Sequence, residues 1–220
     1  MTKYGKDVVL RVLSITLIID GIAYFIDILW LKILLLALSF IFFGFTLYFF
    51  RDPDRKLPEG ISENTILSPA DGKIVLISEV VKNNNEFFNE NVKLKQISIF
   101  LSPLNVHVNR IPITGIVKHF QYIKGDYVVA FNHKSSEKNE RTEIGIIDSS
   151  GKKILFKQIA GYVARRIVCE LTVDRQVKRG ERFGMIKFGS RVDILLSADS
   201  VIKVEIGQKV KGGETIIAGI

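Results

Sequence analysis

The run RGERFGMIKFGSRVDILLS, residues 179–197, reads as β structure with Gly189 and Ser190 in its middle. Glycine weakens a strand because it has no side chain to pack, so it commonly marks a bulge or a close approach of another backbone. The alternative is chemistry at the Gly189-Ser190 bond, because a serine hydroxyl is a nucleophile and glycine leaves the adjacent carbonyl unobstructed. Packing and chemistry both stay open when this bond is considered alone.

Few other side chains could assist such a reaction. His107, in the run NVHVN, is one of three histidines, and imidazole suits proton transfer near neutral pH. Asp71, in SPADGKI, offers a carboxylate, although an aspartate before a glycine is also a common turn residue. His119 and His133 lack metal-ligand spacing with any cysteine or carboxylate pair, so we expect no metal site.

The first 50 residues form a different kind of element. Two apolar helical segments, about Val8–Ile26 and Ile33–Phe50, are joined by DILWLK. The second is uncharged and is just long enough to span a bilayer. A helix rises about 1.5 Å per residue, and the hydrocarbon core is about 30 Å thick. The first carries Arg11 and Asp20, and a charge at the bilayer centre costs about 2.5–3.5 kcal/mol. Residues 1–50 are therefore predicted to form a membrane-associated helical hairpin.

Cations flank this hairpin at both ends, in the sets Lys3, Lys6 and Arg11 and Arg51, Arg55 and Lys56. Such flanks fit a hairpin whose two ends both lie in the cytoplasm. The second apolar run, together with the absence of a small-residue cleavage site, disfavours a cleaved signal peptide. A buried helical hairpin in a soluble core stays open as an alternative.

From residue 66 onward the pattern changes to short apolar runs divided by turn signals such as ADGK, KNNNE, DSSGKK, KRGE and VKGGE. This pattern predicts a mainly β protein, with a compact, mostly antiparallel β domain over residues 51–220. The polar stretch 131–143 is predicted to be a loop, with Asn139–Arg141 either a lid or a solvated group of charges.

Composition narrows the class of protein further. The single cysteine, Cys169, excludes an intrachain disulfide and lies between apolar neighbours, which is typical of a core residue. The net charge is +8, but no basic block is interleaved with aromatic residues, so we expect no nucleic-acid partner. Anionic lipid is a partner that this charge favours.

Five stretches, taken in order along the chain, resemble a known family. They are FFRDPDR, SPADGKI, FLSPLNVHVNRIP, GYVARRIV and GERFGMIKFGSRVD. Together they are similar to the phosphatidylserine decarboxylase proenzymes, in the short form of bacteria and archaea, over nearly the whole chain. The resemblance implies that the Ser190 hydroxyl attacks the preceding carbonyl, so that the chain cuts itself between Gly189 and Ser190. The implied products are a β chain of residues 1–189 and an α chain of residues 190–220, whose covalent cofactor is a pyruvoyl group made from Ser190.

The same resemblance implies that His107 acts in decarboxylation and that Asp71 belongs to a relay that activates the serine. Longer relatives carry a second histidine where this chain has Arg110. Arginine is a poor base, so the base that activates Ser190 stays open, and Arg110 is predicted to hold a phosphate or carboxylate instead.

Three further arginines are candidates for contacts with the substrate. Arg165 and Arg166 are predicted to bind a phosphate, although alternation along a strand turns at most one of them into the site. Arg191, directly after the candidate cleavage bond, is predicted to hold the substrate carboxylate.

The activity implied by the resemblance is that of a carboxy-lyase. It converts a phospholipid serine headgroup to the ethanolamine headgroup and releases CO2, at the cytoplasmic face of the cell membrane. Phosphatidylserine and archaetidylserine both stay open as substrates, since headgroup chemistry does not depend on the lipid tails. The α and β chains are expected to stay together as a heterodimer, and higher oligomers stay open. The alternative is a membrane-anchored carrier or adaptor without catalysis, because residues 192–220 also resemble lipoyl- and biotinyl-type β domains.

Overall fold

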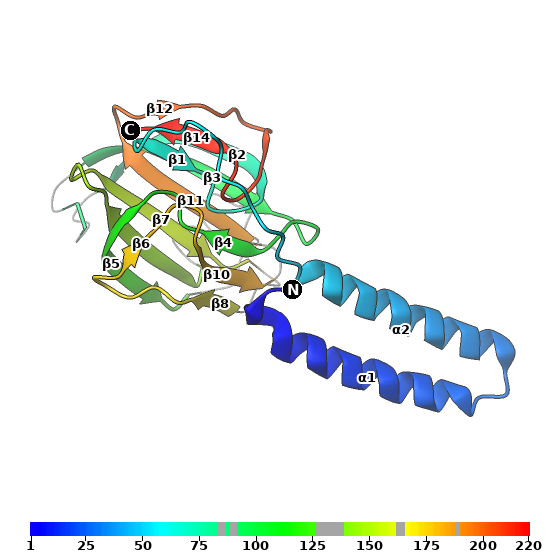
Figure 1. The fold of residues 1–220 in the computed structure, drawn as a ribbon. Helices are drawn as coiled ribbons and strands as arrows, with labels where there is room; N and C mark the ends of the chain where they lie inside the picture. Colours follow the sequence, from blue (N-terminus) through cyan, green and yellow to red (C-terminus); the bar gives the residue numbers. More distant parts are fainter. Residues whose placement is uncertain (83–86, 89–91, 126–138, 162–165, 188–189) are drawn as a thin grey trace. The chain divides into compact units, whose positions relative to one another are not determined.

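The computed structural model describes residues 1–82, 87–88, 92–125, 139–161, 166–187 and 190–220 (Figure 1). The chain divides into two compact units, Met1–Pro53 and Asp54–Ile220. The first unit contains the helices and the second contains all the described strands, which confirms the prediction of a mainly β protein with an N-terminal helical hairpin.

The first unit begins with a short 3-10 helix, Lys3–Gly5, which leads into helix α1, Lys6–Tyr24. Helix α2 follows at Leu29–Phe49. The backbone N–H of Thr2 donates to the carbonyl oxygen of Phe50 over 2.8 Å, which ties the two ends of the hairpin together. Among the described residues, α2 is the one helix that is long and apolar enough to cross a membrane.

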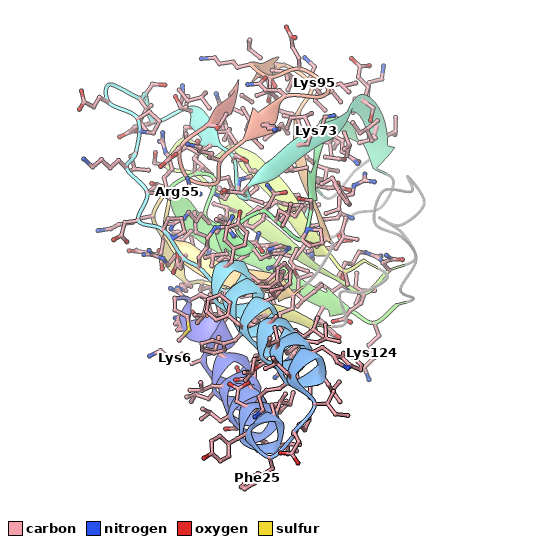
Figure 2. The ribbon with its side chains drawn as sticks, turned by 90° about the vertical axis from the view of Figure 1, so that its right-hand side faces the viewer. Lys6, Phe25, Arg55, Lys73, Lys95 and Lys124 are labelled. Carbon is pink, nitrogen blue, oxygen red and sulfur yellow. The ribbon has the colours of Figure 1, made fainter. Side chains whose placement is uncertain are left out.

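The surface of the hairpin is apolar, while its buried side chains include small polar residues. Thr16 and Thr46 are buried, and each donates its hydroxyl to a carbonyl oxygen of its own helix over 2.8 Å. Phe25, at the end of α1 in Figure 2, and Phe40 in α2 are exposed by 81% and 79%. The hydroxyl groups are thus satisfied within each helix. Lipid would accommodate the outward-facing aromatic rings.

The second unit consists of antiparallel strands in three sheets. The largest sheet has eight strands in the order β13-β2-β3-β11-β7-β6-β5-β9, and the smaller sheets have the orders β4-β10-β8 and β1-β14-β12. The strand bounds are β1 Thr65–Leu67, β2 Gly72–Lys82, β3 Val92–Leu101, β4 Val108–Arg110, β5 Gly115–Ile123, β6 Arg141–Ile147, β7 Lys153–Ile159, β8 Arg166–Cys169, β9 Gln176–Val177, β10 Arg182–Lys187, β11 Ser190–Ser197, β12 Val201–Ile202, β13 Lys209–Val210 and β14 Ile216–Gly219.

The prediction of a loop over residues 131–143 is wrong at its end, because β6 begins at Arg141. Asn139 and Glu140 are buried, so they are not solvated charges either. Residues 131–138 lie outside the described part of the chain. The long polar run misled the prediction because its last polar side chains lie in the interior of a sheet rather than in water.

Strand β11 lies at the centre of the large sheet, between β3 and β7. Val192, Ile194 and Leu196 are fully buried in the main apolar core on one face. Arg191 and Asp193 alternate with them and therefore point to the opposite face, where they are also buried. A strand covered on both faces holds its residues in fixed positions, which suits it to carry a reactive group.

The chain passes between the large sheet and the β4-β10-β8 sheet in two connections that bear on the site. The chain passes from β3 to β4 in one segment and from β10 to β11 in the other. These strands are also partners, because Leu101 pairs with Ser190 and Val108 pairs with Met185. Leu101, the last residue of β3, therefore lies opposite the first residue of β11, at the corner where the chain leaves the large sheet for the smaller one. His107 ends one crossing, and Ser190 begins the strand after the other.

Candidate active site

Ser190 is the first residue of β11, and its side chain is fully buried. Because side chains alternate along a strand, it points to the same face as Val192 and Ile194, which lie in the apolar core. Its Oγ has no hydrogen-bond partner among the described residues. A buried hydroxyl without a partner costs about 1–3 kcal/mol, so an unbonded one in a core indicates a functional reason. Phe188 and Gly189 lie outside the described residues.

The neighbours of Ser190 across the sheet are small or apolar. Leu101 pairs with it on β3, and the register of β7 brings Ala160 to its other side. Ala160 donates its N–H to the Glu140 carbonyl oxygen over 2.9 Å and accepts from the Asn139 side-chain amide over 2.7 Å. Asn139 and Glu140 therefore fix the backbone beside Ser190, which sequence reasoning did not predict.

His107 is fully buried, and its Nδ1 lies 2.9 Å from the carbonyl oxygen of Asn105. A carbonyl oxygen only accepts, so Nδ1 carries the proton of the neutral ring and Nε2 is the basic nitrogen. The Asn105 side chain accepts from the N–H and the hydroxyl of Ser102, which holds this turn in shape. The register of β4 on β10 places His107 opposite the end of β10 that leads to Ser190. The register thus places His107 opposite Ile186, four residues before Ser190 in the chain.

A chain of buried amides lies beside them. The Thr142 hydroxyl donates to Gln158 Oε1 over 2.8 Å, and Gln158 Nε2 donates to Asn109 Oδ1 over 2.9 Å. Gln158 Nε2 also faces the Val168 carbonyl oxygen at 3.4 Å, and that acceptor fixes which way the amide points. Asn109 Nδ2 is buried and has no partner among the described residues. Among the described residues, two buried polar groups of this region thus have no partner, the Asn109 amide donor and the Ser190 hydroxyl.

Gly184 makes the close packing at this corner possible. A Cβ at Gly184 would meet the Val168 carbonyl oxygen at 2.1 Å and Gln158 Nε2 at 3.1 Å. Only glycine allows β8 and the side chain of Gln158 to approach β10 so closely.

Replacing Gln158 by leucine is expected to lower the free energy of unfolding by about 1–3 kcal/mol, because Asn109 Oδ1 and the Thr142 hydroxyl then lose a buried partner. Urea unfolding measures the change. Gln121→Leu, on an exposed part of β5, is the matched control and is expected to change stability by less than about 0.5 kcal/mol. Equal effects of the two substitutions would contradict the role given to the amide chain.

Asp71 is engaged by groups other than Ser190. Its Oδ2 accepts from Arg55 over 2.7 Å, and its Oδ1 accepts from the backbone N–H of Gly212 over 2.8 Å. Arg55, labelled in Figure 2, also pairs with Glu214. The pairing of β2, β3 and β11 puts Asp71 two strands from Ser190, or about 10 Å at the usual strand spacing. The relay role of Asp71 stays a prediction, and it needs a group that bridges this span.

The arginines that were predicted to hold the substrate lie in different settings. Arg110 is buried and donates to the Gly180 carbonyl oxygen over 3.0 Å. Arg166 begins β8 and is exposed, whereas Arg165 lies outside the described residues. Arg191 is buried on the face opposite Ser190 and is paired with Asp193. Contacts of these arginines with the substrate stay predictions.

Glu143 and Cys169 both have pKa values that their surroundings shift. Burial tends to raise the pKa of Glu143, but the ammonium of Lys157 and the guanidinium of Arg141 outweigh it and hold that pKa below its ordinary value. Burial raises the pKa of the Cys169 thiol to about 11, so the thiol stays protonated at neutral pH. The shift supports the interpretation of Cys169 as a core residue.

His119 lies on β5, and His133 lies outside the described residues. Within the described ranges, no three histidine, cysteine, aspartate or glutamate side chains form a group that could hold a metal ion. A hollow of about 620 Å³ at the edge formed by β5 and β9 includes Gly115, Asp148 and Gln176. It lies at the end of β6 far from Arg141 and hence far from Ser190.

Sequence reasoning missed Asn109, Gln158 and Thr142. A signal for Gln158 is present in KILFKQI, where Ile154, Phe156 and Gln158 occupy the core-facing positions of β7. A polar residue at the third of these positions indicates a buried polar partner.

A buried serine that begins a central strand and has no partner among the described residues, together with a buried histidine just before β4, provides the groups of an enzyme that uses a serine nucleophile. Comparison with known proteins identifies the family. Residues 42–218 match the family model described as phosphatidylserine decarboxylase. The chain belongs to the phosphatidylserine decarboxylase family, in its short bacterial form, and membership makes it a carboxy-lyase.

The relatives support this assignment over the full length. The chain is 45% identical to a phosphatidylserine decarboxylase proenzyme of Chlorobium limicola, with 99% of each chain covered. It is 45% identical to the proenzyme of Prosthecochloris aestuarii, over 98% of this chain and 95% of the relative. The identity to the proenzyme of Wolbachia pipientis wMel is 53%, over 79% of this chain and 74% of the relative. The resemblance to this family is therefore confirmed, and the carrier-domain alternative is not favoured.

Proposed function

We propose that this chain decarboxylates the serine headgroup of phosphatidylserine to the ethanolamine headgroup, after cutting itself between Gly189 and Ser190. The observation that carries the proposal is the fully buried Ser190, whose Oγ has no partner among the described residues, at the start of a central strand in a chain of this family. The three relatives named above are called phosphatidylserine decarboxylase proenzymes, which favours a diacyl lipid over an archaeal ether lipid.

The cutting reaction needs no outside reactant except water. The Ser190 Oγ forms a bond to the carbonyl carbon of Gly189, the amide C–N bond breaks, and the hydroxyl proton moves to the amine nitrogen. Loss of the Cα proton of residue 190 then breaks the Cβ–O bond and releases the carboxylate of Gly189. Water removes the nitrogen as ammonia and leaves a pyruvoyl group on the α chain, residues 190–220. His107, whose Nε2 is its basic nitrogen, is the group that we assign to these proton transfers.

When bound to the α chain, the pyruvoyl group supplies the electron sink that loss of CO2 from an amino acid requires. The chain's own residues suit such a group at position 190, because Ser190 is fully buried and its Oγ has no partner among the described residues. His107 is proposed to return a proton to the carbon that loses CO2. The apolar side chains around β11 exclude water, which strengthens the electrostatic effect of each polar group there.

Membrane association follows from the chemistry of the substrate and from the helical unit. Residues 1–50 are proposed to be a membrane-associated hairpin and residues 51–220 the catalytic domain. The length and hydropathy of α2 support membrane contact. The net charge of +8 favours a surface of anionic lipid, and the basic flanks of the hairpin favour the cytoplasmic face. The α and β chains are proposed to remain together as a heterodimer.

Intact-protein mass spectrometry under denaturing conditions tests this proposal. We expect two species, which result from a cut between Gly189 and Ser190. The smaller one should have the mass of residues 190–220 with a pyruvoyl group in place of the N-terminal serine. The cut protein should release CO2 from vesicles containing phosphatidylserine and none from vesicles of phosphatidylcholine. A single full-length species after incubation with lipid membranes would overturn the proposal.

A further inference from the structure

A buried ion pair lies directly behind the proposed cleavage bond. Arg191 Nε donates to Asp193 Oδ1 over 2.6 Å, and a second guanidinium nitrogen lies 3.2 Å from Asp193 Oδ2. Both side chains are only 1% exposed. They are two residues apart on β11, so they share the face opposite Ser190.

The neighbouring strand β3 completes this group. Arg191 also donates to the Ser98 hydroxyl over 2.8 Å. Gln96 donates to Asp193 Oδ2 and to the Ser98 hydroxyl, each over 3.1 Å. Ser98 and Asp193 are partners in the strand register. We call Gln96, Ser98, Arg191 and Asp193 the β11 anchor.

The β11 anchor is a costly arrangement for a core. Buried charges are tolerated only where they are paired and hydrogen-bonded, and an apolar pair of similar volume often serves stability equally well. Its position suggests a specific reason, because Arg191 and Asp193 lie one and three residues after Ser190 on β11. The bonds from Arg191 Nε and from one terminal nitrogen both go to groups on the face opposite Ser190.

We propose that the β11 anchor holds the first residues of the α chain in the sheet once the chain is cut. This inference rests on the proposed function. Before the cut, the chain upstream of Ser190 restrains the start of β11. After the cut, β11 begins with a free end, and strand ends without such restraint fray. Arg191 and Asp193 are thus positioning residues that act through the backbone of residue 190.

The test compares Asp193→Asn in two backgrounds. In the self-cutting chain, the substitution should release the α chain in mild urea at least about tenfold faster, which corresponds to about 1.4 kcal/mol. In the uncut Ser190→Ala background, the same substitution should lower the urea midpoint by a smaller amount than it does in the cut chain. A purely structural role would give equal shifts in both backgrounds. The readouts are the urea midpoint and the mass of the α chain that separates on gel filtration.

Glu181→Gln is the matched control, because it also turns a paired carboxylate into an amide. Glu181 and its partner Arg175 both belong to the β chain, so the loss of their ion pair should shift cut and uncut proteins equally. If Asp193→Asn prevents cutting, Gln96→Ala takes its place, since it removes one donor to the Asp193 carboxylate. If the anchor variant lowers the urea midpoint equally in cut and uncut proteins, the proposed role of the β11 anchor is wrong, while the proposed function stands. An unmutated chain that never cuts would overturn both the proposed function and the anchor.

Discussion

Ser190→Ala is expected to leave a single full-length chain with no decarboxylase activity. The substitution removes the Oγ that attacks the preceding carbonyl, and no pyruvoyl group can form without it. The fold should survive, because this hydroxyl is buried and has no partner among the described residues, so that its removal takes away a desolvated polar group. We expect the free energy of unfolding to stay the same or to rise by up to about 1 kcal/mol.

Intact mass and release of CO2 from phosphatidylserine vesicles measure this result. Ser200→Ala is the matched control, because Ser200 is also buried but lies beyond the end of β11 and bonds to the Ser197 hydroxyl. The control chain should be cut as fully as the unmutated chain. A cut Ser190→Ala chain would move the cleavage site to another residue.

Local patterns in the sequence were sufficient for the helices and for most of the strands. The apolar runs of the first 50 residues are long and continuous, so α1 and α2 lie within a few residues of the predicted segments. In β11, Arg191 and Asp193 alternate with Val192 and Ile194, and this alternation predicts a strand with one apolar face. Such patterns act over a few residues and need no knowledge of distant contacts.

The corner of the candidate site could not be predicted from local pattern. It arises because β3 to β4 and β10 to β11 both cross between two sheets, and each crossing depends on partners far away in the sequence. The motif containing His107 and the Gly189-Ser190 pair each indicated chemistry, but only the strand register brings them together. Long-range pairing of this kind leaves no periodic signal in either segment.

The arginines and Asp71 show a second limit. Their expected roles came from the family resemblance and from their places in the motifs, and these roles stay predictions. The structure adds partners that the motifs did not predict, since it pairs Arg191 with Asp193, and Asp71 with Arg55 and the N–H of Gly212. A charge inside a core must find an opposite charge, and the identity of that partner is decided by tertiary packing. Motif spacing alone could therefore not predict these pairings.

His107→Ala is expected to slow self-cutting by about 10²–10⁴-fold, the usual contribution of a positioned general base. Nδ1 of His107 donates to the Asn105 carbonyl oxygen, and this bond leaves Nε2 as the nitrogen that can accept a proton. Arg110, where longer relatives have a second histidine, cannot replace it, because a guanidinium stays protonated. Cell-free synthesis gives a defined starting time, and intact mass then follows the appearance of the two chains. Release of CO2 per cut molecule measures decarboxylation separately.

Imidazole provides a readout that a purely structural role of His107 would not give. The substitution leaves a space of about the volume of the ring, so added imidazole should restore part of the cutting rate, more strongly at a pH where it is neutral than where it is protonated. His119→Ala, on β5, is the matched control, and it should cut at the normal rate with no response to imidazole. A His107→Ala chain that cuts and decarboxylates at the normal rate would remove His107 from the mechanism. Another base would then be needed, and it would have to be sought near Ala160, whose backbone Asn139 and Glu140 hold beside Ser190.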